Sequence, residues 1–497
     1  MQCFLRQRLP RICRWIDYPL DAQLATFWKL LKTAARTEWG KTYDIKSIRH
    51  PDQFRQRIPV QSYEALRPFI QRMMQGEPNV LWPSSIHWFA KSSGTTSGRS
   101  KYIPISKESL YLNHYRGSMD VLACYCAAVP NTRLFRGKGI IVGGSHHPVE
   151  NRSIRTGDLS AVLMQNMSFF AQSYRTPALS VALMEQWEKK VELMARLTLR
   201  EDVTNLSGVP SWTLLLLKKV LELAQTNDLH AVWPHLELYI HGGVSLEPYR
   251  SSFTSFVPSG TLRFMEVYNA SEGFFAFSFA PGDTDLLLHL DCGIYYEFIP
   301  EEEFENEHPR TCLLHEVECN KLYALVVTTP GGLWRYNTTD TVRFSSLRPY
   351  KIQLSGRIKF FINVFGEEVI QENAEQALRV ACEATGAIAH EYTVAPVFLT
   401  TRQRGCHEWL IEFERHPDDL ERFTSVLDQT LRRLNSDYDA KRQQDLALTK
   451  PVVRAVPKHT FYNWLKAKNK LGGQHKVPRL SNDRQIVEEI LSQLAQA

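Results

Sequence analysis

A ten-residue stretch rich in glycine and hydroxyl side chains constrains this chain more than any other. It runs Ser92-Ser93-Gly94-Thr95-Thr96-Ser97-Gly98-Arg99-Ser100-Lys101. The apolar segments on either side, 86–90 and 102–105, predict strands. The stretch therefore predicts a loop between two strands. In such a loop glycine lets the backbone approach a phosphate, and backbone N–H groups and hydroxyls donate hydrogen bonds to it. Lys101 adds a positive charge for phosphate oxygens.

The stretch departs from the common P-loop. That pattern has four residues between its glycines and closes on Lys-Ser/Thr. Here three residues separate Gly94 from Gly98, and Arg99 follows. Composition alone leaves a second interpretation open, a surface loop without a ligand, because clusters of Ser, Thr and Gly are typical of such loops.

Length and composition set outer bounds on fold and function. A chain of 497 residues is long enough for several hydrophobic cores. Its 43% apolar and 23% charged residues are typical of a soluble globular protein. The net charge of +6 is small for this length, so it gives no reason to expect a nucleic-acid partner. It is compatible with an anionic substrate such as ATP.

Cysteines and terminal segments bear on the cellular compartment. The nine cysteines are an odd number, and Cys124 and Cys126 are too close to form a Cys-x-x-Cys pair. We interpret them as reduced thiols of a cytoplasmic protein. Arginines interrupt residues 1–14, which excludes a secretory signal. No apolar run reaches the roughly 20 residues that span a bilayer, so we expect no membrane segment.

The order of predicted elements indicates an α/β architecture. Residues 16–80, 109–128 and most of 159–225 predict helices, and 138–144, 236–240 and 262–267 predict strands. Residues 294–345 predict a β-rich portion. Beyond it, strands at 390–399, 408–414 and 452–456 alternate with helices starting near 373 and spanning 418–436 and 460–468. We expect a large N-terminal domain over residues 1–355 and a small C-terminal α/β domain over 356–497.

Two loops after predicted strands form a second candidate site. Gly242-Gly243 follows the strand at 236–240, and Tyr268-Asn269-Ala270-Ser271-Glu272-Gly273 follows the strand at 262–267. Open α/β sheets bind ligands at the carboxyl ends of their strands. The glycines would let an adenine ring lie on the backbone, Tyr268 would stack, and Glu272 would suit magnesium, which prefers oxygen ligands. The other interpretation is that Glu272 caps a following helix and Tyr268 belongs to the core.

The residue order in these stretches resembles the motifs of one family. Ser92–Lys101, continued by Tyr102-Ile103-Pro104, resembles the first nucleotide motif of the Gretchen Hagen family of acyl-acid amido synthetases. This family lies within the adenylate-forming superfamily that contains acyl-CoA synthetases and luciferases. Tyr268-x-x-Ser271-Glu272-Gly273 resembles the second motif of the family. The resemblance implies that Ser92, Ser93, Gly94, Thr95, Thr96, Ser97, Gly98, Gly242, Gly243, Tyr268 and Ser271 bind the nucleotide.

A third motif is present in altered form. Residues Tyr336 to Asp340 resemble the family pattern Tyr-Arg-x-Gly-Asp, with Asn337 in place of the arginine and Thr339 in place of the glycine. The departures put in question any role of that arginine and a tight turn that needs glycine. Asp340 is retained, and its carboxylate can accept hydrogen bonds from two ribose hydroxyls.

Two further segments resemble landmarks of the superfamily. Ser355-Gly356-Arg357 resembles the place where the large and small domains meet, and the resemblance puts Arg357 among the nucleotide-binding residues. Gln474-x-Lys476-x-Pro478-Arg479 resembles the closing segment of bacterial family members. By that resemblance Lys476 enters the active site during adenylation.

The resemblance implies an ATP-dependent ligase that adenylates a carboxylic acid and transfers the acyl group to an amine, typically an amino acid. Its catalytic residues would be Lys476, Glu272 and Lys101, with magnesium held by Glu272. We expect a monomer without a membrane or nucleic-acid partner. Two alternatives stay open, namely transfer of the acyl group to a thiol and a nucleotide-binding protein without activity. The sequence does not identify the acid.

Overall fold

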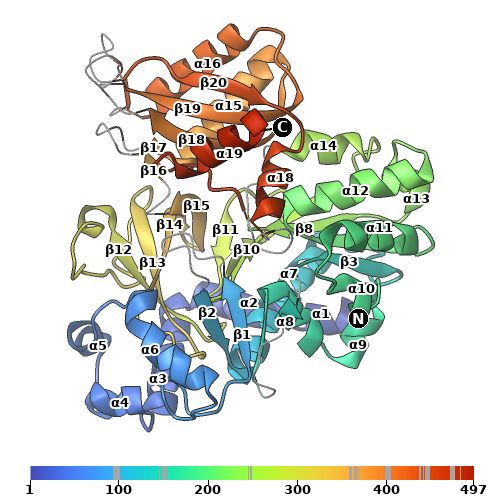
Figure 1. Cartoon of the computed structure of the whole chain (residues 1–497). Helices are drawn as coiled ribbons and strands as arrows, with labels where there is room; N and C mark the ends of the chain where they lie inside the picture. Colours follow the sequence, from blue (N-terminus) through green and yellow to red (C-terminus); the bar gives the residue numbers. More distant parts are fainter. Residues whose placement is uncertain are drawn as a thin grey trace. The chain divides into compact units, whose positions relative to one another are not determined.

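The computed structural model describes residues 2–92, 101–144, 146–147, 154–243, 246, 249–357, 361–362, 367, 369–397, 405–435, 438–439, 442, 448–468, 470, 476–481 and 483–496 (Figure 1). The chain divides between Leu354 and Ser355 into two compact units, and the short segment Glu247–Ser251 groups with the second. Each unit has its own cluster of buried apolar side chains.

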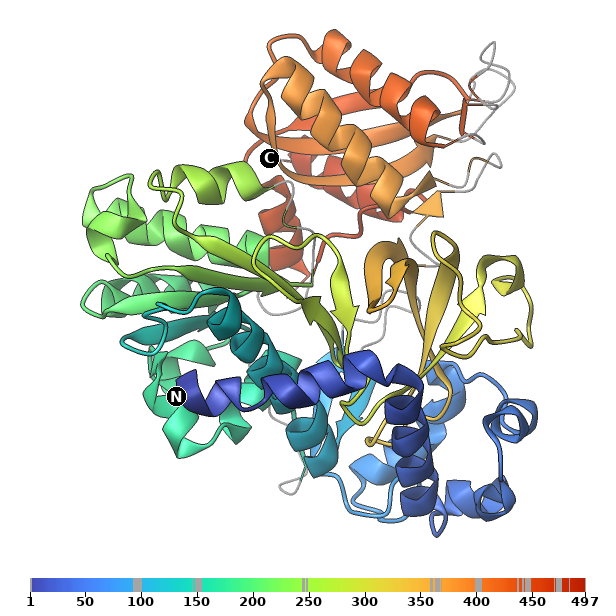
Figure 2. The same ribbon diagram turned by 180° about the vertical axis from the view of Figure 1, so that it is seen from behind.

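The first unit begins with a run of helices, drawn in blue in Figure 2. They are α1 (Gln2–Arg6), α2 (Leu9–Asp17), α3 (Pro19–Ala34), α4 (Glu38–Thr42), η1 (Ile45–Ser47), α5 (Pro51–Arg57) and α6 (Tyr63–Met74). Side-chain caps fix three of their starts, because Thr37 accepts from Gly40 N, His50 from Asp52 N and Ser62 from Ala65 N. The helical prediction for this region is confirmed.

A mixed sheet forms the centre of the first unit. Eleven strands of the described chain follow the order β12-β13-β14-β15-β11-β10-β9-β8-β7-β3-β6. Their bounds are β3 (Lys138–Val142), β6 (Arg175–Thr176), β7 (Val203–Gly208), β8 (Leu238–Gly242), β9 (Arg263–Ala270), β10 (Gly273–Ser278), β11 (Leu286–Leu288), β12 (Tyr295–Pro300), β13 (Leu322–Thr328), β14 (Tyr336–Leu347) and β15 (Tyr350–Arg357). Strands β6, β3, β7, β8 and β9 run parallel, and the pairs that β10 makes with β9 and β11 are antiparallel.

Helices connect the parallel strands. They are α8 (Leu159–Asn166), α9 (Phe169–Ser173), α10 (Leu179–Ala182), α11 (Trp187–Thr198), α12 (Pro210–Ala224), α13 (Leu229–Val232) and α14 (Arg250–Ser255), and η4 (Glu301–Glu303) follows β12. The helical prediction for 159–225 is largely confirmed but omits β6 and β7. The sequence of β7, Val-Thr-Asn-Leu-Ser-Gly, has weak strand propensity. Pairing with β3 on one side and β8 on the other makes it a strand.

A smaller sheet carries the glycine- and hydroxyl-rich stretch. Its order is β2-β1-β5-β4, from β1 (Trp88–Ser92), β2 (Lys101–Ile105), β4 (His146–His147) and β5 (Arg155–Gly157). Strands β1 and β2 are antiparallel with Ser92 opposite Lys101, so the stretch joins two strands as predicted. The chain continues into the π-helix η2 (Ser109–His114) and then α7 (Tyr115–Ala128). The predicted helix at 109–128 is confirmed, with a π-helical first part.

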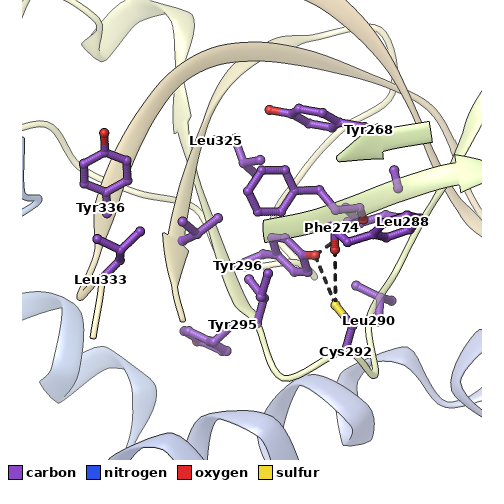
Figure 3. Packing of buried hydrophobic residues seen from close by; sticks show 14 of the residues in the cluster. Tyr268, Phe274, Leu288, Leu290, Cys292, Tyr295, Tyr296, Leu325, Leu333 and Tyr336 are labelled. Atoms are coloured by element: carbon purple, nitrogen blue, oxygen red, sulfur yellow. Dashed lines mark hydrogen bonds between the residues drawn. The ribbon is translucent and has the colours of Figure 1, made fainter. Parts of the chain in front are cut away.

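Aromatic and aliphatic side chains from β9 to β14 form part of the core of the first unit (Figure 3). Tyr268 is 7% exposed, and its ring lies edge-on to Phe275 with centroids 4.8 Å apart. Tyr336, the first residue of the third motif, is fully buried. Burial of each such ring contributes about 1.5–3 kcal/mol. Both motif tyrosines are therefore held by the core as well as lying at strand ends.

The second unit is a small α/β domain. It contains β16 (Phe361–Ile362), β17 (Val369–Ile370), α15 (Gln371–Thr385), β18 (Ile388–Val397), β19 (Cys406–Arg415), α16 (Leu420–Leu434), β20 (Val452–Val456), α18 (Thr460–Ala467) and α19 (Gln485–Gln496). Strand β19 pairs antiparallel with β18 and parallel with β20. The predicted order of strands and helices from α15 to α18 is confirmed, and α19 was not predicted.

The described part of the chain offers no helix that combines the length and the apolar character needed to span a membrane. The eight cysteines whose side chains are described are all unpaired thiols. Burial raises the pKa of the Cys124 thiol to about 12, so it is protonated at neutral pH.

Candidate active site

Glycines gather where the parallel strands of the first unit end. Gly143-Gly144 follows β3, Gly208 ends β7, and Gly242-Gly243 closes β8. A Cβ on Gly242 would lie 2.2 Å from the carbonyl oxygen of Val267, so only glycine lets β8 lie this close to β9. Gly243 has a φ of +82°, which also favours glycine. This carboxyl edge is where an open α/β sheet binds its ligand.

The second motif forms the turn of a hairpin at this edge. Ala270 at the end of β9 pairs with Gly273 at the start of β10, and Ser271 and Glu272 make the turn between them. Residues 273–278 are a strand, so the interpretation of Glu272 as a helix cap is wrong. Ser271 is buried, and the Glu272 side chain is half-buried.

The third motif forms a bulge in β14. Asn337 pairs with Val326 and Thr341 pairs with Ala324, so three residues of β14 lie opposite the single residue Leu325. The Thr338 hydroxyl donates to the Leu325 carbonyl at 2.9 Å, and the Asn337 Oδ1 accepts from Thr339 N at 2.9 Å.

The two residues that depart from the family pattern of the third motif, Asn337 and Thr339, lie at this bulge. Thr339 has a φ of +64°, a left-handed conformation that is unusual for a β-branched residue. Threonine thus takes the conformation that glycine would adopt more easily. Asn337, which replaces the family's arginine, stabilises the bulge from within through its side-chain oxygen.

A short hydrogen bond joins the second and third motifs. The Tyr268 hydroxyl donates to Asp340 Oδ2 at 2.5 Å, and each residue is only 7% exposed. The two residues are 72 positions apart in the chain. Strands β9 and β14 therefore bring together the two side chains that the sequence assigns to the nucleoside.

Lys101 lies at the base of the glycine- and hydroxyl-rich stretch. Its Nζ is 5.7 Å from the centre of the Tyr63 ring, within cation–π range. The Tyr63 hydroxyl accepts from Tyr102 N at 2.8 Å and so ties α6 to β2. Residues Ser93, Gly94, Thr95, Thr96, Ser97 and Gly98 lie outside the described residues, and Ser92 is described as the last residue of β1.

Lys476 belongs to the second unit and is exposed. The segment that follows it runs beside β18, since Thr393 Oγ1 donates to Pro478 O at 2.6 Å and Val394 N donates to Arg479 O at 2.9 Å. The Arg479 guanidinium lies 4.6 Å from the centre of the Tyr392 ring and forms an ion pair with Glu391. Lys476 therefore projects from a segment that is fastened to the sheet. The side chain of Arg357 lies outside the described residues.

Sequence reasoning missed a buried lysine at the carboxyl edge. Lys190 on α11 donates from Nζ to the carbonyls of Gly143 and Gly144 at 2.6 and 3.1 Å. Burial lowers its pKa to about 8, against the smaller opposing effect of Asp158. Its position in an amphipathic helix resembles that of any surface lysine, so no local signal identifies it.

A charged cluster behind the third motif was also missed. Arg335, directly before Tyr336, forms a buried ion pair with Glu297 at 2.8 Å. Its guanidinium also donates to Thr311 Oγ1 at 2.8 Å and to the carbonyl of Arg55 at 2.7 Å. The cluster joins β12, β14 and the end of α5.

The donor groups of this edge fit a nucleotide and a hard cation. The carboxylate of Asp340 suits ribose hydroxyls, and the carboxylate of Glu272 on a turn suits Mg²⁺, which commonly uses one or two protein carboxylates. Among the described residues no group of three or more His, Cys, Asp or Glu side chains gathers as a metal cluster.

The fold is shared with adenylate-forming enzymes. A solved acyl acid amido synthetase, GH3.15, is 17% identical, has a TM-score of 0.80, and matches over 98% of this chain and 96% of that chain. A 2-hydroxyisobutyryl-CoA ligase in complex with 2-HIB-AMP is 13% identical with a TM-score of 0.59, over 96% of this chain and 92% of that chain. The chain thus has the α/β fold of these two enzymes.

Comparison with known protein families identifies the family of this chain. The GH3 family N-terminal domain matches residues 8–262, the central domain 287–357 and the C-terminal domain 372–485. The chain therefore belongs to the GH3 family. It is 23% identical to indole-3-acetic acid-amido synthetase GH3.3 of Arabidopsis thaliana, over 93% of this chain and 89% of that protein. It is also 23% identical to jasmonoyl--L-amino acid synthetase JAR4 of Nicotiana attenuata, over 92% and 90%.

Proposed function

We propose that this protein is an ATP-dependent acyl-acid amido synthetase, which activates a carboxylic acid as an acyl adenylate and transfers the acyl group to an amine. The observation that carries the proposal is the Tyr268–Asp340 hydrogen bond at the carboxyl edge of the sheet. It joins two family motifs in a chain whose three parts all belong to the GH3 family.

In the first step the substrate carboxylate oxygen attacks the α-phosphorus of ATP, the bond to the bridging oxygen breaks, and pyrophosphate leaves. Such a step needs positioning and charge neutralisation more than covalent chemistry by the protein. Asp340 and Tyr268 hold the nucleoside, Lys101 and the stretch 92–98 hold the outer phosphates, and Lys476 neutralises charge between carboxylate and α-phosphate. Arg357, Gly242, Gly243 and Ser271 belong to the same nucleotide site.

Magnesium is part of the proposal. Glu272 would hold it, and the ion would neutralise charge on the phosphate oxygens when bound. The turn position of Glu272 leaves its carboxylate at the end of two strands rather than within one. We also propose that the protein works in the cytoplasm as a monomer.

In the second step an amine nitrogen attacks the acyl carbonyl. The amide C–N bond forms, the C–O bond to AMP breaks, and the amine loses a proton to solvent. We propose that an amino acid supplies the amine, because one relative is named a jasmonoyl--L-amino acid synthetase. Residues 356–497 would act as the mobile small domain that carries Lys476 away between the steps.

The acid is a small carboxylic acid in this proposal. The curated relatives are named for indole-3-acetic and jasmonic acids, and a solved GH3.15 structure contains 2,4-DB. A panel of indolyl, aryl and fatty acids therefore covers the classes to be tested.

A thiol acceptor is the second candidate, because the fold is shared with a 2-hydroxyisobutyryl-CoA ligase. The two candidates share the first step and differ in the second. Incubating the preformed acyl adenylate with either an amino acid mixture or coenzyme A separates them by the product formed.

ATP–pyrophosphate exchange across the acid panel, without amine, tests the first step. We expect exchange with at least one acid and its loss in Lys476→Ala, with an unchanged thermal midpoint. Lys470→Ala is the matched control, an exposed lysine six positions earlier in the chain, and should retain activity. Full exchange by Lys476→Ala would remove that residue from the reaction, and no exchange by the wild type with any acid would contradict the proposed function.

A further inference from the structure

Asn113, near the end of η2, binds the second-motif hairpin through both ends of its amide. Its Oδ1 accepts from Phe274 N at 2.7 Å. Its Nδ2 donates to the carbonyls of Phe274 and Cys292 at 3.1 and 3.2 Å. Asn113 is 1% exposed, so these bonds replace water completely. One side chain thus fixes the start of β10, directly after Glu272.

His114, the next residue, binds the other strand of the same hairpin. Its Nδ1 lies 2.9 Å from Asn269 Oδ1, near the end of β9. An amide oxygen only accepts, so Nδ1 carries the proton and Nε2 is the acceptor nitrogen. Burial lowers the pKa of His114 to about 4, against the weaker effect of Asn269, so the ring is neutral at pH 7.

The two contacts lie on either side of the motif turn. Asn269 is two residues before Ser271, and Phe274 is two residues after Glu272. Two adjacent side chains of one helical turn therefore hold both strands between which the predicted magnesium ligand lies. Their turn is π-helical, a form that occurs mostly as a local insertion and frequently at functional sites.

The same segment also contacts the approach to the third motif. Ser106, between β2 and η2, donates from Oγ to the carbonyl of Pro330 at 2.7 Å. A Cβ on Gly331 would lie 2.5 Å from the carbonyl oxygen of Pro104, so this approach is close. The segment 102–114 thus contacts two motifs. Its first residues contact the chain before the third motif, and its last residues contact the second motif.

We propose that Asn113 and His114 are positioning residues for adenylation, which hold the second-motif hairpin so that Tyr268 and Glu272 meet MgATP in the reactive geometry. The inference rests on the proposed function. A displacement of about 1 Å at a reacting group can reduce a rate by about 100-fold. Loss of these hydrogen bonds should therefore slow catalysis even though Asn113 and His114 do not contact the substrate.

Variants of His114 separate positioning from a direct ligand contact. An asparagine places its amide near the position of Nδ1, and a glutamine places it near Nε2. We expect His114→Leu to raise the KM for MgATP and lower the exchange rate by about tenfold or more, with the KM for the acid nearly unchanged. His114→Asn should recover most of this loss, and His114→Gln should not.

The controls keep the inference distinct from a general loss of stability. Tyr111→Phe changes a side chain of η2 that is 58% exposed and should leave exchange unchanged. Wild-type kinetics in folded His114→Leu would overturn the inference. Rescue by His114→Gln instead of His114→Asn would also overturn it, because Nε2, which has no hydrogen-bond partner among the described residues, would then be the functional atom.

ATP affinity, measured by calorimetry without acid, provides a readout that does not depend on turnover. If the wild type exchanges with no acid, the proposed function fails. A weaker ATP affinity of His114→Leu, restored in His114→Asn, would still support the positioning role. Equal ATP affinities of the three proteins would contradict it.

Discussion

The Tyr268–Asp340 hydrogen bond joins the second and third motifs, but the two motifs are supported in opposite ways. Behind the third motif lies the charged pair Arg335–Glu297, with side chains 3% and 1% exposed. Each guanidinium nitrogen of Arg335 donates to a carboxylate, hydroxyl or carbonyl of the first unit. Behind the second motif lie the neutral side chains Asn113 and His114, and the Nε2 of His114 has no partner among the described residues.

The difference has a physical reason. A buried charge must be paired, and removing one partner leaves a large desolvation cost. The Arg335 cluster is complete within the protein, so it serves the scaffold. A neutral amide or imidazole can be buried with partial pairing at smaller cost. Neutral groups of this kind can support a binding site without adding a charge that would compete with the charged groups that bind the ligand.

Breaking the charged cluster should have the largest effect. Arg335→Met leaves Glu297 buried and unpaired, and we expect the free energy of unfolding of the first unit to fall by about 3–5 kcal/mol. Denaturant unfolding of that unit measures it. Arg335→Met combined with Glu297→Leu should recover much of the loss. Arg72→Met, which breaks exposed ion pairs with Glu38 and Glu77, should lower the free energy of unfolding far less. Equal losses at Arg335 and Arg72 would contradict the comparison.

The second-largest effect should come from low pH, which should destabilise the folded protein through His114. The pKa of His114 is lowered from 6.5 to about 4 in the folded protein. Between these values the unfolded chain binds the proton and the folded chain does not, so stability falls as pH falls from 6.5 to 4. The resulting loss in the free energy of unfolding reaches about 3 kcal/mol below pH 4. The acid dependence of the thermal midpoint should be shallower in His114→Asn, and parallel curves for the two proteins would show that His114 does not titrate in this way.

The bond between the motifs should have an intermediate effect. Asp340→Ala removes the carboxylate proposed to hold the ribose, and we expect ATP to bind about tenfold more weakly or worse, with little change in affinity for the acid. Tyr268→Phe keeps the carboxylate but removes its 2.5 Å hydrogen bond, and should weaken ATP binding less. Calorimetric titration of both variants measures this order. An unchanged ATP dissociation constant in Asp340→Ala would remove Asp340 from the ribose site.

The smallest effect is expected at the bulge of the third motif. Thr339 at φ +64° is strained, and Thr339→Gly should stabilise the first unit by about 0.5–1 kcal/mol after the entropy cost of glycine is subtracted. Thr341→Gly, in extended strand two residues later, should destabilise by a similar amount. Thermal unfolding of both variants tests the sign. A loss of stability in Thr339→Gly would mean that the threonine side chain contributes more than its strain removes.

Much of the fold follows from local patterns. Hydrophobic periodicity and turn residues predict the elements from α15 to α18 of the second unit, because these strands and helices are long and regular. Strands β6 and β7 escaped prediction, since β6 has two residues and β7 contains Asn, Ser and Gly. Pairing with neighbours far away in the sequence overrides their weak propensity.

The candidate site divides in the same way. Motif wording identifies Tyr268, Glu272, Asp340 and Lys476, because a motif records residue type and spacing. It does not reveal Asn113, His114 or Lys190, whose importance comes from burial and from the partners they meet. Nor does it decide whether Glu272 caps a helix or turns a hairpin, which depends on whether residues 273–278 find a strand to pair with.

The sequence alone determined the family, most of the order of elements and the side chains proposed to carry the chemistry, since these are properties of residue type and local spacing. Only the tertiary structure decided that Tyr268 donates to Asp340, that threonine occupies a left-handed position in the third motif, and that neutral side chains of η2 hold the second. Those features depend on contacts between residues far apart in the chain. Their free energies come from burial and long-range hydrogen bonding, which no local pattern encodes.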